Sequence, residues 1–208
     1  MELFKKTLLI LVAVFLFKLM NSCCLIFGDC CKNDPLPTSF NNIKISNVDN
    51  SKEYDVLTTS NEMKRAAVAF NVNVFDTNYY NYYSYAKSCS FGFSQAYAME
   101  CENPFAVITR INCISITTKY DINSSIKAGE EVVNHFVAKT EFWSLSGLYS
   151  TVDDVLDNQR GVIYEPWLDI RFYLKIPVEN NIAQFDFQIF MSDGSVISDS
   201  TNLISIVD

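Results

Sequence analysis

Three segments of the chain alternate apolar and polar residues, and this pattern predicts strands that bury one face in a core. They cover residues 68–74, 168–176 and 185–191. The second is the longest of the three. Its apolar face consists of Leu168, Ile170, Phe172, Leu174 and Ile176.

Turn and helix signals extend this pattern. Asp193-Gly194 suits the positive φ angles of a hairpin turn, and residues 195–207 supply a return strand. A short helix is predicted at residues 151–156, where Thr151 can cap the first turn and acidic residues favour the N-terminal end of the helix dipole. Weaker strand signals cover residues 43–48, 106–118 and 135–143.

About seven short strands with hairpin signals and little helix predict an all-β fold, an antiparallel β-sandwich for which the immunoglobulin topology is one candidate. The 208 residues, less a removable leader, suffice for one domain with a sizeable core. We therefore expect a single β-sandwich domain over residues 43–208.

The N-terminus has the features of a secretory signal. Lys5 and Lys6 precede an apolar run at residues 8–17, which is too short to span a membrane, since spanning takes about 20 apolar residues. Residues 19–23 (LMNSC) resemble the bacterial lipobox, which implies that residues 1–22 are removed and that Cys23 is lipidated. Because Lys18 interrupts the signal, an ordinary cleaved signal and an uncleaved anchor stay open.

Charge narrows the range of partners. The net charge is −8 for the whole chain, and removal of residues 1–22 leaves 13 basic and 23 acidic side chains, or −10. Such an acidic domain repels phosphate backbones, so nucleic-acid binding is not expected.

The chain contains seven cysteines, and lipidation of Cys23 would leave six, an even number for an oxidising compartment. Disulfide candidates are Cys89, Cys101 and Cys113. No C-x-x-C pair occurs and the single histidine, His135, has no partner at ligand spacing, so no metal or cofactor is expected. Residues 23–42 are predicted to form the lipidated N-terminus and a flexible tether.

Residues 76–98 are rich in aromatic side chains interleaved with Asn, Ser and Gly. Tyrosine offers flat amphipathic area that suits stacking on sugar rings or contact with a protein. The alternative is that these rings cover the sandwich edge or pack a long loop. The candidate binding residues are Tyr79, Tyr80, Tyr82, Tyr83 and Tyr85.

Catalytic signals are weak, because no G-x-S-x-G motif occurs and His135 stands alone. Asp153, Asp154 and Asp157 could offer oxygen ligands to calcium, but they lack the EF-hand spacing and suit a solvated helix cap better. We therefore do not expect an enzyme. Two sequons, Asn123-Ser124-Ser125 and Asp199-Ser200-Thr201, are possible glycosylation sites.

Several short motifs add a family resemblance. The lipobox with its Cys-Cys start, residues 96–104 (AYAMECENP), residues 117–121 (TTKYD) and the final strand pair are similar to an uncharacterised lipoprotein family of Bacteroidota. The resemblance implies a β-rich exported domain, anchored by lipid in the bacterial cell envelope. We expect the outer membrane, with the domain on its periplasmic or surface face.

The resulting hypothesis is a noncatalytic, lipid-anchored envelope protein that binds a glycan or a protein. The alternative is a structural or assembly subunit of an envelope complex, in which a sheet edge pairs with a neighbouring chain. The third hypothesis is a hydrolase whose active site has no recognisable motif.

Overall fold

The structure is a computed structural model that describes residues 35–79, 104–140, 148–157 and 161–208. Within these ranges it contains mostly strands. The strands are β1 (Leu36–Thr38), β2 (Asn42–Asp49), β3 (Val56–Thr58), β4 (Glu62–Lys64), β5 (Val68–Phe75), β6 (Phe105–Val107), β7 (Ile111–Thr118), β8 (Phe136–Thr140), β9 (Val162–Ile163), β10 (Trp167–Leu174), β11 (Ile182–Ala183), β12 (Phe185–Met191), β13 (Val196–Ser200) and β14 (Ile204–Val207). The helical elements include a 3-10 turn, η1 (Val133–His135), and helix α4 (Val152–Asp157), and residues 77–79 are also helical.

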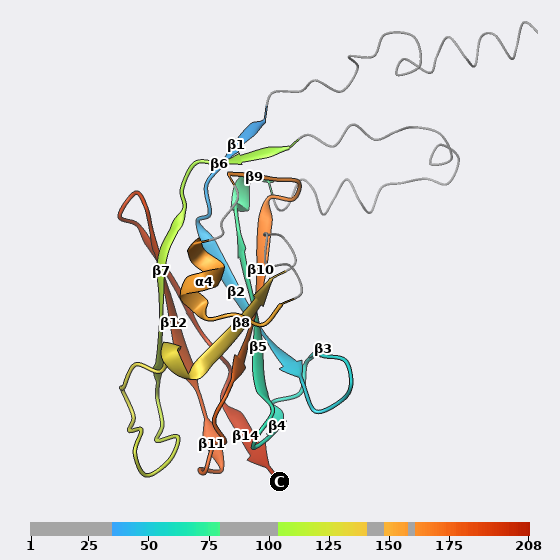
Figure 1. Ribbon diagram of the computed structural model, residues 1–208, viewed down its shortest axis with the longest axis vertical. Coiled ribbons are helices and arrows are strands. Elements are labelled where there is room, and N and C mark those ends of the chain that lie inside the picture. The colour runs from blue at the N-terminus through green and yellow to red at the C-terminus, as the bar shows by residue number, and fades with distance from the viewer. Residues whose placement is uncertain (1–34, 80–103, 141–147, 158–160) are drawn as a thin grey trace, which may run out of the picture.

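Two sheets form the body of the domain (Figure 1). One has five strands in the order β3-β2-β5-β10-β8, and the other has three in the order β13-β12-β7. Every pairing within these two sheets is antiparallel. The predicted all-β fold of packed antiparallel sheets is confirmed.

An aromatic cluster joins the two sheets. Phe70 on β5 and Phe172 on β10 meet Phe187 on β12 edge to face, with ring centroids 6.0 and 5.4 Å apart. Phe136 on β8 meets Phe185 on β12 at 5.6 Å. All five rings are fully buried. The centre of the hydrophobic core therefore lies between the five-stranded sheet and β12.

Two small sheets close the ends of the sandwich (Figure 1). Their strand orders are β1-β6-β9 and β11-β14-β4. Each contains one parallel pair, β1 with β6 and β14 with β4, so the pairing of the whole domain is not purely antiparallel. Because β1 begins at Leu36 and Phe40 is buried, folded structure starts before residue 43, where the sequence analysis placed the domain boundary.

The three strongly alternating segments form β5, β10 and β12, as predicted. Asp193-Gly194 lies in the hairpin between β12 and β13, and Gly194 has a φ of +87°, which favours glycine. Two expected single strands are each divided. Residues 106–118 become β6 and β7, and residues 195–207 become β13 and β14, because the two halves of each pair with different sheets.

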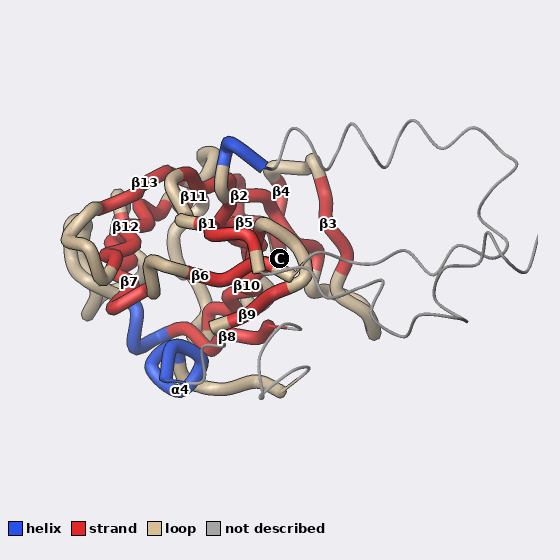
Figure 2. Tube along the Cα trace, turned by 90° about the horizontal axis from the view of Figure 1, so that it is seen from above, coloured by secondary structure: helices blue, strands red, loops and turns tan. Residues whose placement is uncertain are grey.

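The predicted helix is α4, which lies beside β8 and β7 at one edge of the sandwich (Figure 2). The Thr151 hydroxyl accepts a hydrogen bond from the Asp154 amide at 3.1 Å and donates one to the Asp154 carboxylate at 2.6 Å. The cap is therefore confirmed. Among the described residues, no helix is both long and apolar enough to cross a bilayer.

Candidate functional site

A polar groove of about 460 Å³ lies on the outer face of the three-stranded sheet formed by β13, β12 and β7. Its walls come from all three strands, because the register places Thr117 of β7 opposite Asp186 of β12 and Asp186 opposite Ser200 of β13. The inward positions of these strands hold the core rings, so the polar side chains must face outward. The lining residues are Thr117, Lys119, Asp186, Phe187, Gln188, Ser198, Asp199 and Ser200.

Three side chains at one end of the groove are linked by hydrogen bonds. The Lys119 ammonium lies 2.9 Å from Asp186 Oδ1 and donates to Ser200 Oγ at 3.2 Å. The Ser200 hydroxyl donates to Asp186 Oδ1 at 2.5 Å. Next along the sheet, Gln188 and Ser198 face solvent. The groove thus presents both donors and acceptors, in positions fixed by the sheet.

The side chains that line the groove offer mainly hydrogen-bonding groups. Lys119 and Ser200 both contact Asp186 Oδ1, so the three side chains hold one another in place. The one apolar lining residue, Phe187, is fully buried and offers no exposed ring for stacking. A ligand in the groove would be held by hydrogen bonds to hydroxyl, amide and carboxylate groups.

This groove is not predicted by any motif in the sequence. Asp186 and Gln188 were visible as outward positions of a predicted strand, but their neighbours on β7 and β13 follow only from the strand register. The alternating pattern indicates which polar side chains face outward. It does not indicate which strands are neighbours, and the groove depends on that order.

The outer face of the five-stranded sheet carries a second polar network. Asp55, which precedes β3, accepts hydrogen bonds from Arg171 at 2.5 Å and from the Tyr173 hydroxyl at 2.6 Å. Burial alone would raise the pKa of Asp55, but these two hydrogen bonds outweigh it and hold the pKa below its ordinary value. Burial and the same hydrogen bond raise the pKa of Tyr173. The network ties the segment before β3 to strand β10.

Replacing Asp55 by asparagine is expected to lower the free energy of unfolding by roughly 1.5–3 kcal/mol at neutral pH, the range for hydrogen bonds to charged groups. Since the folded pKa of Asp55 is lowered, its contribution is complete above the unfolded pKa of about 4 and is lost as pH falls through the folded value. Urea unfolding at several pH values should show the difference between wild type and Asp55→Asn shrinking below about pH 4. The exposed Asp153→Asn variant serves as control, and a difference independent of pH would contradict the assignment.

Only one of the five candidate tyrosines, Tyr79, lies within the described residues. It is half-buried, packs against the main core and meets Phe105 edge to face at 5.4 Å. The Tyr79 ring thus packs against the core, and its role as a binding residue stays a prediction. Tyr80, Tyr82, Tyr83 and Tyr85 lie outside the described residues, so their role as a binding surface stays a prediction.

The cysteine predictions lie mostly outside the description as well. Cys113 is on β7 with an exposed thiol that is unpaired among the described residues. Cys23, Cys89 and Cys101 fall in segments that the structure does not describe. Lipidation and disulfide pairing stay predictions.

His135 ends the 3-10 turn before β8, and its carbonyl accepts the Lys175 amide at 2.8 Å. On α4, Asp153 and Asp157 are exposed, while Asp154 takes part in the cap. In the described part of the chain, no three or more His, Cys, Asp or Glu side chains come together in a way that could hold a metal ion.

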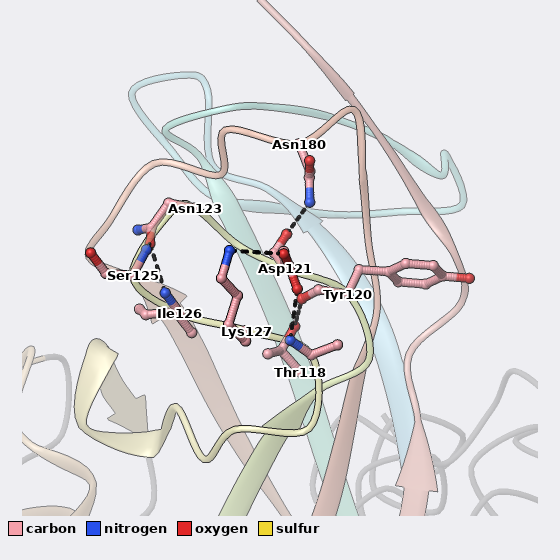
Figure 3. Close-up of polar contacts among 9 residues, drawn as sticks. Thr118, Tyr120, Asp121, Asn123, Ser125, Ile126, Lys127 and Asn180 are labelled. Carbon is pink, nitrogen blue, oxygen red and sulfur yellow. Dashed lines mark hydrogen bonds and ion pairs between the residues drawn. The ribbon is translucent and has the colours of Figure 1, made fainter.

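The two sequons occupy different environments. Asn123 lies in the loop after β7, where its side-chain oxygen accepts the amides of Ser125 and Ile126 at 2.9 and 3.0 Å (Figure 3). In the same loop Asp121 pairs with Lys127 at 3.1 Å. Ser200 lies in the groove, and its neighbour Thr201 is buried and accepts the Phe185 amide at 3.0 Å.

Comparison with protein-family profiles finds no match, and comparison with curated proteins finds none at the level of sequence. The fold is similar to that of a DUF4466 family protein from Parabacteroides merdae, with a TM-score of 0.37 and 11% identity. That comparison covers 83% of this chain and 46% of the other. The C-terminal domain of the Streptococcus agalactiae AgI/II polypeptide BspA follows, with a TM-score of 0.25, 9% identity, and coverage of 80% and 49%. The chain spans about half the length of these proteins or less.

Proposed function

We propose that this protein is a noncatalytic, lipid-anchored component of the bacterial cell envelope. It binds a glycan in the polar groove on the β13-β12-β7 sheet. One observation carries the binding proposal. A groove of about 460 Å³ is lined almost entirely by hydroxyl, amide, carboxylate and ammonium groups. This volume falls within the roughly 300–1,000 Å³ typical of small-molecule sites, whose walls are usually more apolar.

A glycan fits the groove better than a protein. Protein interfaces draw most of their binding energy from buried aromatic and arginine anchors, and the groove exposes no aromatic or arginine side chain. The hydroxyl groups of a sugar both donate and accept hydrogen bonds, as do the groups on these walls. The lipobox at Cys23 supports the location, and the acidic charge argues against nucleic acid.

The test is a glycan array probed with the full chain in detergent, followed by titration calorimetry with the best-bound oligosaccharide. Asp186→Ala is expected to weaken binding about 10- to 100-fold, because a hydrogen bond to a charged group contributes about 1.5–3 kcal/mol. Gln188→Ala provides a second variant, since this side chain is exposed on the outer face of β12. Both variants should keep the wild-type circular dichroism spectrum.

The matched control is Asp153→Ala, which removes an exposed carboxylate from α4, outside the groove. It should bind like wild type. A wild-type protein that recognises no glycan on the array would contradict the proposal. Folded Asp186→Ala and Gln188→Ala variants that bind at wild-type strength would contradict the placement in the groove.

A second candidate function is an assembly subunit that pairs through a sheet edge. The observation that favours it is β3, an edge strand of the five-stranded sheet on which Val56 and Leu57 are exposed. An exposed edge strand is a template for strand addition by another chain. Isolation of a stable complex that is lost in a Leu57→Lys variant would favour this function over glycan binding.

A further inference from the structure

One of the two small end sheets presents an apolar outer face. Its strands are β1, β6 and β9, and its inner face holds Phe105 and Ile163, which are buried in the core. Side chains alternate between the two faces of a sheet, so the residues next to these face outward. The register places three of them in one row across the sheet: Pro37 of β1, Ala106 of β6 and Val162 of β9. The outward row is therefore wholly apolar.

Two large side chains extend this row. Ile108 and Tyr164 lie two residues beyond Ala106 and Val162, and their exposed fractions are 65% and 60%. Val162 itself is 44% exposed. None of residues 36–38, 105–108 and 162–164 carries a charge. Single exposed apolar side chains are ordinary, whereas several together mark an interaction site. We call Pro37, Ala106, Ile108, Val162 and Tyr164 the end face.

The end face lies where the chain enters the described domain (Figure 1). Strand β1 begins at Leu36, and 36 − 23 gives 13 residue steps from Cys23. A fully extended chain spans at most about 3.6 Å per residue, so these steps reach at most about 47 Å. A lipid on Cys23 would hold the end face near the bilayer at an effective concentration of about millimolar, as short linkers do. Even weak contact with lipid would then be populated.

The composition of the end face favours a phospholipid surface with zwitterionic headgroups. A tyrosine ring suits the interface of a bilayer, because its body is apolar and its hydroxyl can stay in water. The net charge of −10 on residues 23–208 repels anionic headgroups, and the end face has no cation to offset it. A stable protein interface takes about 20–30 residues a side, far more than the end face offers.

We propose that the end face docks on the zwitterionic bilayer that holds the lipid anchor, an inference that rests on the anchor at Cys23 in the proposed function. Docking would orient the domain. Strand β7 begins at Ile111, close to the end face, and leads away from it (Figure 1). Thr117 and Lys119 of the groove lie at the far end of this strand. The docked domain would therefore present the groove away from the bilayer.

The experiment places a tryptophan on the end face of the lipidated full chain in vesicles of phosphatidylcholine and phosphatidylethanolamine. Bromine atoms on the acyl chains of the phosphatidylcholine quench a tryptophan that contacts them. The emission of Tyr164→Trp is compared with that of the wild type, which has two tryptophans of its own. We expect brominated lipid to reduce the added emission roughly twofold or more, because interfacial aromatic rings lie at the headgroup level.

The matched control is Tyr54→Trp, which makes the same change at a tyrosine that is 73% exposed and lies before β3, outside the end face. Its added emission should not respond to bromine. Adding Ile108→Asp and Val162→Asp to the Tyr164→Trp chain should restore the emission, because a carboxylate resists transfer out of water. Adding Leu203→Asp, at an exposed position before β14, should leave the quenching unchanged.

Flotation of the wild type with the vesicles reports the anchor separately. If the wild type does not float, the anchor of the proposed function fails. The same reporter is then measured with a histidine tag at residue 23 on nickel-chelating lipid. Equal quenching of Tyr164→Trp and Tyr54→Trp, or none of either, on a vesicle-bound chain would overturn the docking proposal. An unquenched Tyr164→Trp whose emission changes with protein concentration would assign the end face to a second copy and overturn it as well.

Discussion

Replacing Phe187 by alanine is expected to lower the free energy of unfolding by about 3–5 kcal/mol, the cost of deleting a fully buried ring whose cavity cannot collapse. Phe187 has no exposed surface, and its ring meets Phe172 at 5.4 Å and Phe70 at 6.0 Å, from two strands of the opposite sheet. The loss therefore falls on the contact that joins the sheets. Native domains have a total stability of about 5–15 kcal/mol, so this loss would remove a large share of it.

Urea unfolding followed by tryptophan fluorescence would measure this loss. The matched control is Phe190→Ala on the same strand, because Phe190 faces outward and is only half-buried. It should cost about 1 kcal/mol, near the centre of the distribution for point mutants. Equal losses for the two variants would contradict the assignment of the inward face of β12. A small loss for Phe187→Ala alone would mean that the core does not lie between the two sheets.

The same strand shows why much of the fold was predictable. On β12, Phe185, Phe187 and Ile189 are buried while Asp186 and Gln188 face outward, so the local sequence carries the signal of the sheet face. The turn at Asp193-Gly194 was predictable for a similar reason. A tight turn needs a positive φ at one of its few residues, and glycine at that position is visible in the sequence.

The division of residues 106–118 could not be predicted in this way. The β6 part pairs in parallel with β1, nearly 70 residues earlier, and the β7 part pairs with β12, about 70 residues later. Both halves are apolar and rich in β-branched residues, so the periodicity alone predicts one continuous strand. Partners distant in sequence decide where the chain passes from one sheet to another.

The groove was missed for the same physical reason, and so were the hydrogen bonds of Asn71 and Asn73 to Asp169. Asp186 acquires its groove neighbours through pairing with β7 and β13, and Asp169 meets Asn71 and Asn73 only because β10 lies beside β5. Sequence reasoning could state that these polar side chains face outward. Which of them share a surface depends on strand order and register, and these are set by the whole core.

Cys23→Ala is expected to abolish incorporation of a palmitate analogue and to release the protein from the membrane fraction. The thiol of Cys23 is the atom that the proposed lipobox would present for alkylation, and alanine has no group to replace it. Stable anchoring requires more than one acyl chain, because a single myristoyl chain binds membranes only with an association constant of about 10⁴ M⁻¹. A variant that loses both the diacylglycerol and the acylated amino group should therefore behave as a peripheral or free protein.

The neighbouring cysteine provides the control. Cys24→Ala removes a thiol one residue away and should keep full labelling and membrane association, since only the first residue of the mature chain is modified. The two alternatives to lipidation give different results. An ordinary cleaved signal would leave even the wild type unlabelled and in the soluble fraction. An uncleaved anchor would leave the wild type unlabelled, membrane-bound and heavier by residues 1–22. Equal labelling of Cys23→Ala and wild type would place the lipid elsewhere and remove the anchor from the proposed function, while the groove and its glycan could still be tested separately.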